Sequence, residues 1–556
     1  MREEILSQKS GQKIILLGNE AITRGALEAG VDFVSTYPGT PATEVGDTFA
    51  KISKELKVYF EYSTNEKVAL EAGAGASFSG LRSLCAMKHF GANVAQEILI
   101  PLCYSGVPSP LVIIVADDPN CWSSAQSEQN SRALSLLAHI PILEPADPQE
   151  CKEFTKLGFE ISARFKIPVM VRTTTRVSHQ RGVVKLGKLK IQKSKGKFVK
   201  NPQMFVTMPP RVLEMKKELL GKIEKIRELS ERSPLNQIIT PEDKISRAQV
   251  GIVTSGISYL YVREALKKLN LFLPILKLGF FHPLPEKKLK NFIKRFKKVL
   301  IVEELEPYLE KEVARLAKEV NCTLKVFGKG YLPEVGELRP EYVTEAVAKI
   351  SGKKLKFNFQ KHKKEYITLS PPQRTPDLCP GCYYRLIFKA IKEVAPKNTV
   401  FGGDIGCYML AGFHNLQDYL YCMGSSVGIA HGIKKTTNQK VIALIGDSTF
   451  FHAGIPALIN TVFNKSNPLI IVMDNQTTAM TGHQQHPGGY GRFKTKDSLI
   501  KIEDIAKACG VKNVAVIDPL NYQKMKKIIK GFLKKKDVSV IVARRLCWLF
   551  EQRMKK

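Results

Sequence analysis

The chain has 556 residues, of which 44% are hydrophobic and 25% charged, as in an ordinary soluble globular protein. A chain of this length is expected to form about three domains, each with its own core. No apolar run reaches the roughly 18 residues of a membrane-spanning helix, and the N-terminus lacks the apolar stretch of a signal peptide. We therefore expect a cytoplasmic protein.

Lysine and arginine outnumber aspartate and glutamate by 33, and the lysines are concentrated in stretches at 185–200, 287–298, 353–364 and 524–536. Such a charge could attract an acidic partner or nucleic acid, or it could cover solvated faces. No nucleic-acid-binding motif accompanies the charge. We therefore favour the explanation that the lysines cover solvent-exposed faces, and we do not expect nucleic acid to be a partner. An acidic redox partner stays open.

The first segment alternates short apolar runs with helical stretches. Expected strands lie at 13–17, 33–36, 111–116 and 168–172, and expected helices at 21–29 and 66–81. This alternation predicts a parallel sheet covered by helices. We assign it to a first α/β domain at 1–184.

The rest of the chain divides into two linkers and two further domains. A lysine-rich segment at 185–245, with a helical stretch at 212–232, is interpreted as a helical linker. A smaller α/β domain is expected at 246–351, with strands at 250–255, 299–302 and 324–327 and a helix at 259–269. A second polar linker is expected at 352–376, and a third α/β domain at 377–556, with strands at 441–445, 469–473 and 538–543.

The most informative stretch of the third domain is 441–475. One strand ends in Gly446-Asp447-Ser448, and after a helical stretch the next strand ends in Asn475-Gln476-Thr477. Ligands of open α/β sheets bind at the carboxyl ends of the strands, and Mg²⁺ prefers oxygen ligands together with phosphates and water. Gly446 would let a phosphate approach the backbone. Asp447 and Asn475 could instead cap a helix and a turn, which Gly-Asp alone would favour, but the whole pattern, with Asn475 28 residues after Asp447, is more specific.

This spacing resembles that of the thiamine-diphosphate enzymes, whose motif is Gly-Asp-Gly followed after a similar interval by Asn. Here Ser448 stands where the family has the second glycine. The resemblance implies that Asp447, Asn475 and the carbonyl of Thr477 bind Mg²⁺.

Thiamine-diphosphate catalysis also needs a carboxyl group against the aminopyrimidine ring of the cofactor. In the family this glutamate comes from a second α/β domain, just before a helix rich in glycine and alanine. Residues 65–76, NEKVALEAGAGA, fit that pattern, with Glu66 at the best position and Glu71 as the alternative. On its own, Glu66 could simply be a surface residue favoured at a helix start.

Four of the eleven cysteines form a pattern. Cys379-Pro380-Gly381-Cys382 opens the third domain, and Cys407 and Cys547 are single. A C-x-x-C pair alone could indicate zinc, redox chemistry or nothing. Together the four resemble the thiamine subunit of the 2-oxoacid:ferredoxin oxidoreductases, which implies that they bind one [4Fe–4S] cluster.

Within that group, the chain resembles the alpha subunits of the indolepyruvate ferredoxin oxidoreductases. Matching segments lie at 37–44, 65–71, 87–95, 115–120, 127–132, 172–179, 254–259, 302–307, 423–428 and 474–488. The resemblance implies an α/β fold with two thiamine-diphosphate-binding-type parallel-sheet domains (pyrimidine and pyrophosphate) flanking a smaller domain like the C-terminal domain of transketolase.

The resemblance also implies a reaction. An aryl 2-oxoacid such as indolepyruvate loses CO₂, coenzyme A takes the acyl group, and electrons pass through the cluster to ferredoxin or another iron–sulfur subunit. A smaller beta subunit is the expected partner. Thr40 is the expected substrate contact, and His452 and His483 could transfer protons or be structural. The expected cofactor-binding residues are Tyr37, Pro38, Thr40, Glu66, Gly406, Met423, Gly424, Gly446, Asp447, Ser448, Asn475 and Thr477.

Two features depart from the family pattern. Tyr383-Tyr384 follows the C-P-G-C motif where the family often has Pro-His, and the sequence ends nine residues after Cys547, where the family commonly adds a ferredoxin-like domain. We therefore expect any further clusters to come from another subunit. The alternatives are a non-oxidative thiamine-diphosphate decarboxylase, which has no use for the four cysteines, and a basic binding protein on a decayed enzyme scaffold. The sequence does not discriminate among 2-oxoacids.

Overall fold

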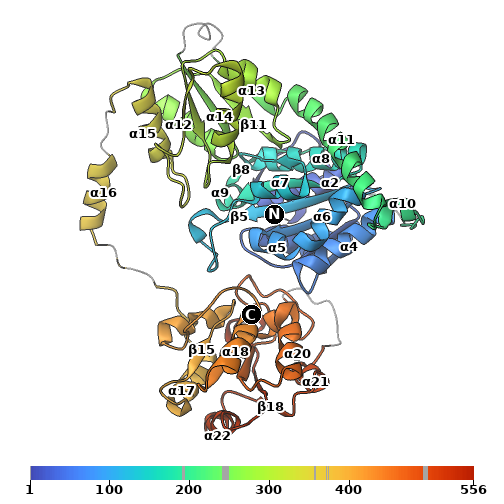
Figure 1. The fold of residues 1–556 in the computed structure, drawn as a ribbon, viewed down its shortest axis with the longest axis vertical. Helices are drawn as coiled ribbons and strands as arrows, with labels where there is room; N and C mark the ends of the chain where they lie inside the picture. Colours follow the sequence, from blue (N-terminus) through green and yellow to red (C-terminus); the bar gives the residue numbers. More distant parts are fainter. Residues whose placement is uncertain are drawn as a thin grey trace. The chain divides into compact units, whose positions relative to one another are not determined.

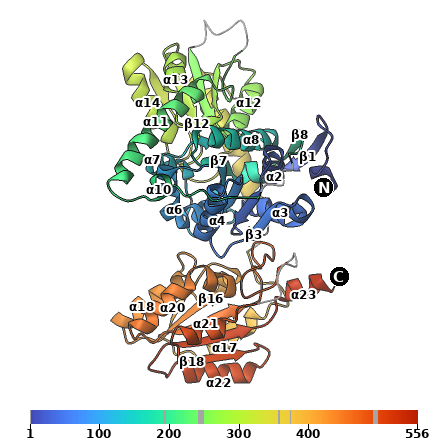
Figure 2. The same cartoon turned by 90° about the vertical axis from the view of Figure 1, so that its right-hand side faces the viewer.

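The computed structural model describes residues 2–190, 195–240, 249–355, 359–370, 372, 375–491 and 499–555 (Figures 1 and 2). The chain forms two compact units, one of Met1–Glu61 with Glu66–Pro371 and the other of Tyr62–Asn65 with Pro372–Lys556. Parts of the linkers expected at 185–245 and 352–376 lie outside the described residues, so the domain boundaries stay predictions.

The first unit contains a seven-stranded sheet in the order β12-β6-β7-β5-β4-β2-β3, in which β12 is Phe280–His282, β6 is Ile142–Leu143 and β3 is Tyr59–Tyr62. Its parallel centre consists of β2 (Phe33–Thr36), β4 (Ser83–Lys88), β5 (Leu111–Asp117) and β7 (Val169–Thr174). The central strands are buried because helices cover the sheet, as parallel sheets require. Helices α4 (Glu66–Phe78) and α8 (Pro148–Phe165) contact its strands, and α2 (Gly18–Ala29) packs on α8.

The strand expected at 13–17 forms, but its expected place in the parallel sheet is wrong. It is β1 (Lys13–Leu17), which pairs antiparallel with β8 (Arg181–Lys185) in a separate two-stranded sheet. Ile15 and Val183 are 64% and 59% exposed. This ribbon therefore has one solvated face, which antiparallel pairs tolerate and parallel sheets do not.

A second sheet in the same unit has five strands in the order β14-β13-β10-β11-β9. Strands β10 (Val250–Ser255), β11 (Ile275–Leu278), β13 (Lys298–Val302) and β14 (Lys325–Phe327) run parallel, and β9 (Asn236–Ile239) is antiparallel to β11. Helices α12 (Ser258–Leu269), α14 (Tyr308–Val320) and α15 (Pro340–Ser351) belong to this sheet. Both α11 (Arg211–Arg232) and β9 lie within the expected linker.

The second unit contains an all-parallel sheet in the order β15-β16-β17-β19-β18. The strands are β15 (Val400–Gly402), β16 (Val441–Gly446), β17 (Leu469–Asp474), β18 (Asn513–Ile517) and β19 (Ser539–Arg544). Helices α17 (Tyr384–Val394) and α22 (Tyr522–Phe532) contribute to one hydrophobic core, and α18 (Ser425–Thr436), α20 (Ile455–Phe463) and α21 (Ile502–Ala508) to another. The predicted α/β fold class is confirmed. None of the helices in the described ranges combines the length and hydrophobicity needed to cross a membrane.

Candidate active site

Asp447 and Asn475 lie at the carboxyl edge of the sheet in the second unit. Strands β16 and β17 pair in parallel with Gly446 opposite Met473, so the residues that follow both strands are neighbours. Asp447 is 3% exposed and accepts a hydrogen bond from the Ser448 N–H at 2.9 Å. Asn475 Oδ1 accepts from the Thr477 N–H at 3.1 Å. These oxygens are the kind that Mg²⁺ binds.

His486 contacts Asp447 and was missed from the sequence. Its Nε2 lies 3.1 Å from Asp447 Oδ2, and its Nδ1 accepts a hydrogen bond from the Gly488 N–H at 3.2 Å. Because Nδ1 is the acceptor, this network assigns the proton of the neutral ring to Nε2, which donates to Asp447. A histidine that orients a carboxylate ligand in this way is a typical second layer of a metal site.

Negative charge gathers at the same edge. Burial and the nearby charge of Asp447 raise the pKa of Asp474 to about 7, although Arg544 Nε donates to this carboxylate at 2.6 Å and opposes the shift. Two buried carboxylates side by side disfavour each other's ionised form. A divalent cation at this edge would relieve that repulsion, so the residues present fit a bound Mg²⁺.

Asp404 fixes the loop before α18 through hydrogen bonds. This residue, too, was not identified from the sequence. Asp404 is fully buried, and its carboxylate accepts hydrogen bonds from the N–H groups of Ile405, Gly424 and Ser426 at 2.7, 3.0 and 3.1 Å. Burial raises the pKa of Asp404 to about 6. Gly424 has φ +85°, and a Cβ there would come within 2.8 Å of the Ala453 carbonyl carbon. These contacts fix Met423 and Gly424, two of the expected cofactor-binding residues.

Gly446 and Gly406 both pack against the ring of Tyr408. A Cβ on Gly446 would come within 2.5 Å of Tyr408 Cε1, and the Tyr408 hydroxyl donates to the Ile405 carbonyl at 2.7 Å. Ser448 Oγ accepts a hydrogen bond from Thr478 Oγ1 at 3.2 Å. A side chain at position 446 would clash with Tyr408. Glycine is therefore required there for packing as well as for the predicted approach of a phosphate.

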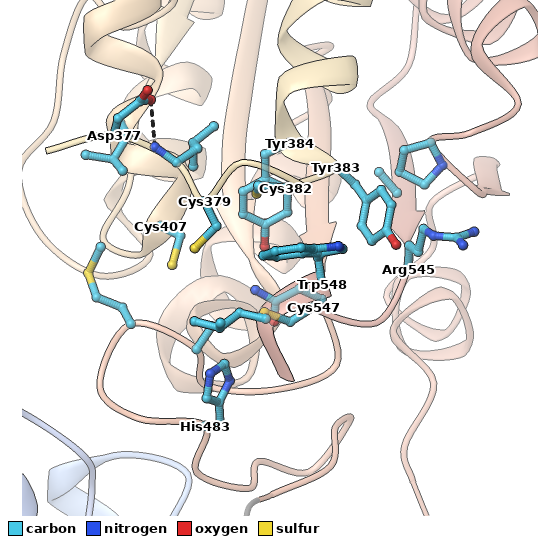
Figure 3. Close-up of a pocket in the computed structure, with 18 residues that line it drawn as sticks. Asp377, Cys379, Cys382, Tyr383, Tyr384, Cys407, His483, Arg545, Cys547 and Trp548 are labelled. Atoms are coloured by element: carbon cyan, nitrogen blue, oxygen red, sulfur yellow. Dashed lines mark hydrogen bonds between the residues drawn. The ribbon is translucent and has the colours of Figure 1, made fainter. Parts of the chain in front are cut away.

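The four predicted cluster cysteines line one cavity of about 290 Å³ in the second unit (Figure 3). Cys379 and Cys382 belong to the loop before α17, Cys407 begins the 3₁₀ stretch Cys407–His414, and Cys547 directly precedes α23 (Trp548–Met554). Asn475 lines the same cavity, and its carbonyl accepts a hydrogen bond from the Cys547 N–H at 3.0 Å. The expected metal edge and the cysteine cavity are therefore adjacent.

The cysteine thiols disfavour one another's ionisation. Burial, followed by the charges of Cys547 and Cys379, raises the pKa of Cys382 to about 11. Burial and the charges of the other three raise the pKa of Cys407 to about 12, and burial also raises the pKa of Cys547. Thiolates are the metal-binding form of cysteine, so Cys382, Cys407 and Cys547 would ionise together only beside bound positive charge.

Within the described residues, no three His, Cys, Asp or Glu side chains surround a point where a single metal ion could bind. The expected groups do not require such a set of side chains. In a [4Fe–4S] cluster each cysteine binds a different iron, which spreads the four sulfur atoms around a cavity. Mg²⁺ completes its shell with phosphate and water oxygens. The cavity and its four thiols fit a cluster.

The two histidines named from the sequence lie in different surroundings. His452 is buried in the π-helical stretch Phe450–Gly454. His483 lines the cysteine cavity, with its ring stacked on Phe550 at a centroid distance of 5.0 Å. The histidine that contacts Asp447 is His486.

The remaining expected residues belong to the first unit. Tyr37, Pro38 and Thr40 follow β2, and Thr40 Oγ1 lies 3.3 Å from Thr43 Oγ1. Glu66 is the first residue of α4 and is 5% exposed. Its carboxylate packs against Gly91, where an added Cβ would come within 2.5 Å of Glu66 Cγ. Glu71, the alternative, is paired with Lys67 at 2.5 Å.

Two family models match parts of the chain. A family model described as "Thiamine pyrophosphate enzyme, C-terminal TPP binding domain" matches residues 404–543. A second, described as "Pyruvate flavodoxin/ferredoxin oxidoreductase, thiamine diP-bdg", matches residues 24–225. The first match includes Asp447 and Asn475, and the second includes Glu66.

Relatives match over nearly the whole chain. The indolepyruvate oxidoreductase subunit IorA of Methanothermobacter marburgensis is 42% identical over 99% of this chain and 89% of its own length. The subunit of the same name from Pyrococcus horikoshii is 44% identical over 98% of this chain and 87% of its own length. The solved structure of the 2-oxoglutarate:ferredoxin oxidoreductase from Magnetococcus marinus is similar over 61% of this chain and 65% of that chain, with TM-score 0.48 and 18% identity.

Proposed function

Since the chain belongs to the family of indolepyruvate oxidoreductase IorA subunits, thiamine-diphosphate-dependent 2-oxoacid:ferredoxin oxidoreductases, we propose that it oxidatively decarboxylates aryl 2-oxoacids through a [4Fe–4S] cluster of its own. The acyl group would pass to coenzyme A and the electrons to ferredoxin or another iron–sulfur subunit. The observation that carries the proposal is the convergence of Cys379, Cys382, Cys407 and Cys547 on one cavity beside Asn475.

The cofactor's diphosphate would be held through Mg²⁺ by Asp447, Asn475 and the carbonyl of Thr477. His486 keeps the Asp447 carboxylate oriented through its hydrogen bond at 3.1 Å. Asp404 keeps the loop of Met423 and Gly424 in place through three backbone N–H groups. When bound, thiamine diphosphate supplies the carbon nucleophile that attacks the keto carbon of the substrate.

The Glu66 carboxyl group would hold the proton that activates the aminopyrimidine ring. Its burial at the start of α4, with Gly91 packed against it, gives a carboxyl group held in one position and shielded from water. Within the proposal, His452 and His483 are the candidates for later proton transfer.

The electrons would leave through the cysteine cavity. A [4Fe–4S] cluster held there by the four cysteines would accept electrons one at a time. Carbon–carbon cleavage alone, as in a non-oxidative decarboxylase, uses none of the four cysteines. A beta subunit is the proposed partner, in line with the naming of the relatives as one subunit of a larger enzyme.

The proposal is tested by replacing one cysteine of the cavity and one outside it. We would purify the chain anaerobically with its partner subunit and follow reduction of a viologen dye with indolepyruvate and coenzyme A. Cys407→Ala should abolish dye reduction, whereas Cys509→Ala, a half-buried cysteine of the same unit that does not line the cavity, should keep it. Equal oxidative activity in both variants would contradict the cluster. Substrate-dependent CO₂ release without any dye reduction in the unmodified protein would favour the non-oxidative decarboxylase.

A further inference from the structure

The segment MKHFGANVA at 87–95 contains a buried lysine that the proposed mechanism does not use. Lys88 is the last residue of β4, at the carboxyl edge of the first sheet, where ligands of parallel sheets bind. It is 8% exposed. Lysine is among the residues least often buried, because removing its charge from water is costly.

Lys88 lies against the turn that contains Thr40. A Cβ on Gly39 would come within 3.1 Å of Lys88 Cβ and 3.8 Å of its Cδ, so the lysine stem runs along this turn. Helix α5 (His89–Val94) begins directly after Lys88 and places Gly91 against the Glu66 carboxylate. One short segment therefore contacts both the expected substrate-binding turn and the expected activating glutamate.

The ammonium group of Lys88 has more hydrogen-bond donors than its contacts in the protein use. Its Nζ donates to the Ser123 carbonyl at 2.7 Å, lies 4.0 Å from Asp118 Oδ2 and is 5.2 Å from the centroid of the Phe90 ring. Asp118 itself already accepts hydrogen bonds from the Ser123 N–H at 2.7 Å and from the hydroxyls of Ser124 and Thr175 at 2.6 and 2.5 Å. An ammonium group has three donors, and one hydrogen bond to a carbonyl leaves two for a ligand.

We propose that the Lys88 ammonium binds the carboxylate of the 2-oxoacid substrate. The inference rests on the proposed function, because it needs a substrate that carries a carboxylate beside the reacting keto group. Every 2-oxoacid shares that carboxylate, whatever its side chain, and a compact cation whose stem is packed against the turn is suited to recognise it. Burial lowers the pKa of Lys88 to about 8, against the raising effect of Asp118, Cys121 and Glu66, so the group is a cation at neutral pH.

In this role Lys88 would make the site bind carboxylate ligands more tightly than neutral ligands of the same shape. Holding the carboxylate beside the turn of Thr40 would fix the orientation of the neighbouring keto carbon. Its loss should therefore weaken binding of carboxylate ligands selectively. A lysine that only secures the loop at Ser123 would instead affect ligands of both kinds alike, or only the stability of the fold.

The test compares two unreactive ligands of nearly the same shape, 3-phenylpropionate and its neutral amide, as inhibitors of the complete enzyme with phenylpyruvate as substrate. In Lys88→Gln the inhibition constant of the carboxylate should rise roughly 10- to 100-fold, the usual worth of a hydrogen bond to a charged group, while that of the amide changes little. The KM of phenylpyruvate should rise more than kcat falls, and Lys88→Arg should recover part of the loss. Lys54→Gln, an exposed lysine of the same unit, is the matched control.

Thiamine diphosphate affinity, measured by calorimetry, should be the same in the Lys88→Gln variant and the unmodified enzyme. An equal change in both inhibition constants, or no change in either, would overturn the assignment of Lys88. Failure of the unmodified enzyme to bind thiamine diphosphate would instead count against the proposed function itself.

Discussion

Replacing Arg132 by methionine should destabilise the first unit more than the loss of any surface ion pair. The side chain is 2% exposed, and its guanidinium donates to both oxygens of Glu144 at 2.7 and 2.8 Å, to Glu303 at 2.9 Å and to Ser255 at 2.7 Å. Glu144 follows the first sheet's β6 (Ile142–Leu143), whereas Ser255 and Glu303 end or follow strands of the second sheet. Arg132 therefore connects the two sheets of this unit through buried hydrogen bonds.

The expected loss of stability in Arg132→Met depends on the partners that Glu144 and Glu303 keep. Removing one member of a buried ion pair costs about 3–5 kcal/mol, because the other charge stays buried. Glu144 keeps Arg172 Nη1 at 3.2 Å, and Glu303 keeps the N–H groups of Leu309 and Glu310, both at 2.9 Å. We therefore expect the lower end of the range, about 3 kcal/mol.

The matched control is Arg315→Met, since Arg315 pairs with three acidic side chains but is 47% exposed. Exposed pairs contribute about 0–1 kcal/mol. Hydrogen exchange in β10 and β13 under native conditions would measure the local opening free energy of both variants. A loss in Arg132→Met no larger than in Arg315→Met would refute the reasoning.

Three further outcomes are expected. Asp447→Asn should lower the affinity for thiamine diphosphate with Mg²⁺ by about 100-fold or more in calorimetry, since the anionic ligand is gone; unchanged affinity would contradict the metal site. His486→Ala should lower the same affinity roughly 10- to 100-fold by releasing the Asp447 carboxylate, and no effect would remove His486 from the site. Burial raises the pKa of Glu304 from 4.5 to about 7, so between these pH values the folded protein keeps a proton that the unfolded chain loses. Its stability should therefore fall as pH rises through this window, and urea unfolding at several pH values should show a weaker fall in Glu304→Gln.

The strands around the candidate site could be predicted because their signals are local. The apolar run at 441–445 became β16 (Val441–Gly446), and the run at 469–473 became β17 (Leu469–Asp474). Two parallel strands joined by a helix must place the residues after them at one edge, so the sequence alone predicts that Asp447 and Asn475 lie close together.

The parts that could not be predicted depend on contacts between distant segments. His486 reaches Asp447 from an irregular stretch after β17, where no periodic pattern fixes side-chain direction. Asp404 acts through backbone N–H groups about 20 residues away in sequence, which carry no side-chain signal. Strand β1 looked like a member of the parallel sheet, because an apolar run does not reveal which strand it pairs with.

The most direct test of the central claim is the iron and acid-labile sulfide content of the anaerobically purified chain. About four iron and four sulfide per chain would indicate one [4Fe–4S] cluster, and both values should fall to near zero in Cys407→Ala but not in Cys509→Ala. Protein that binds thiamine diphosphate yet contains neither iron nor sulfide would contradict the account and leave the four cysteines as structural residues of a cavity.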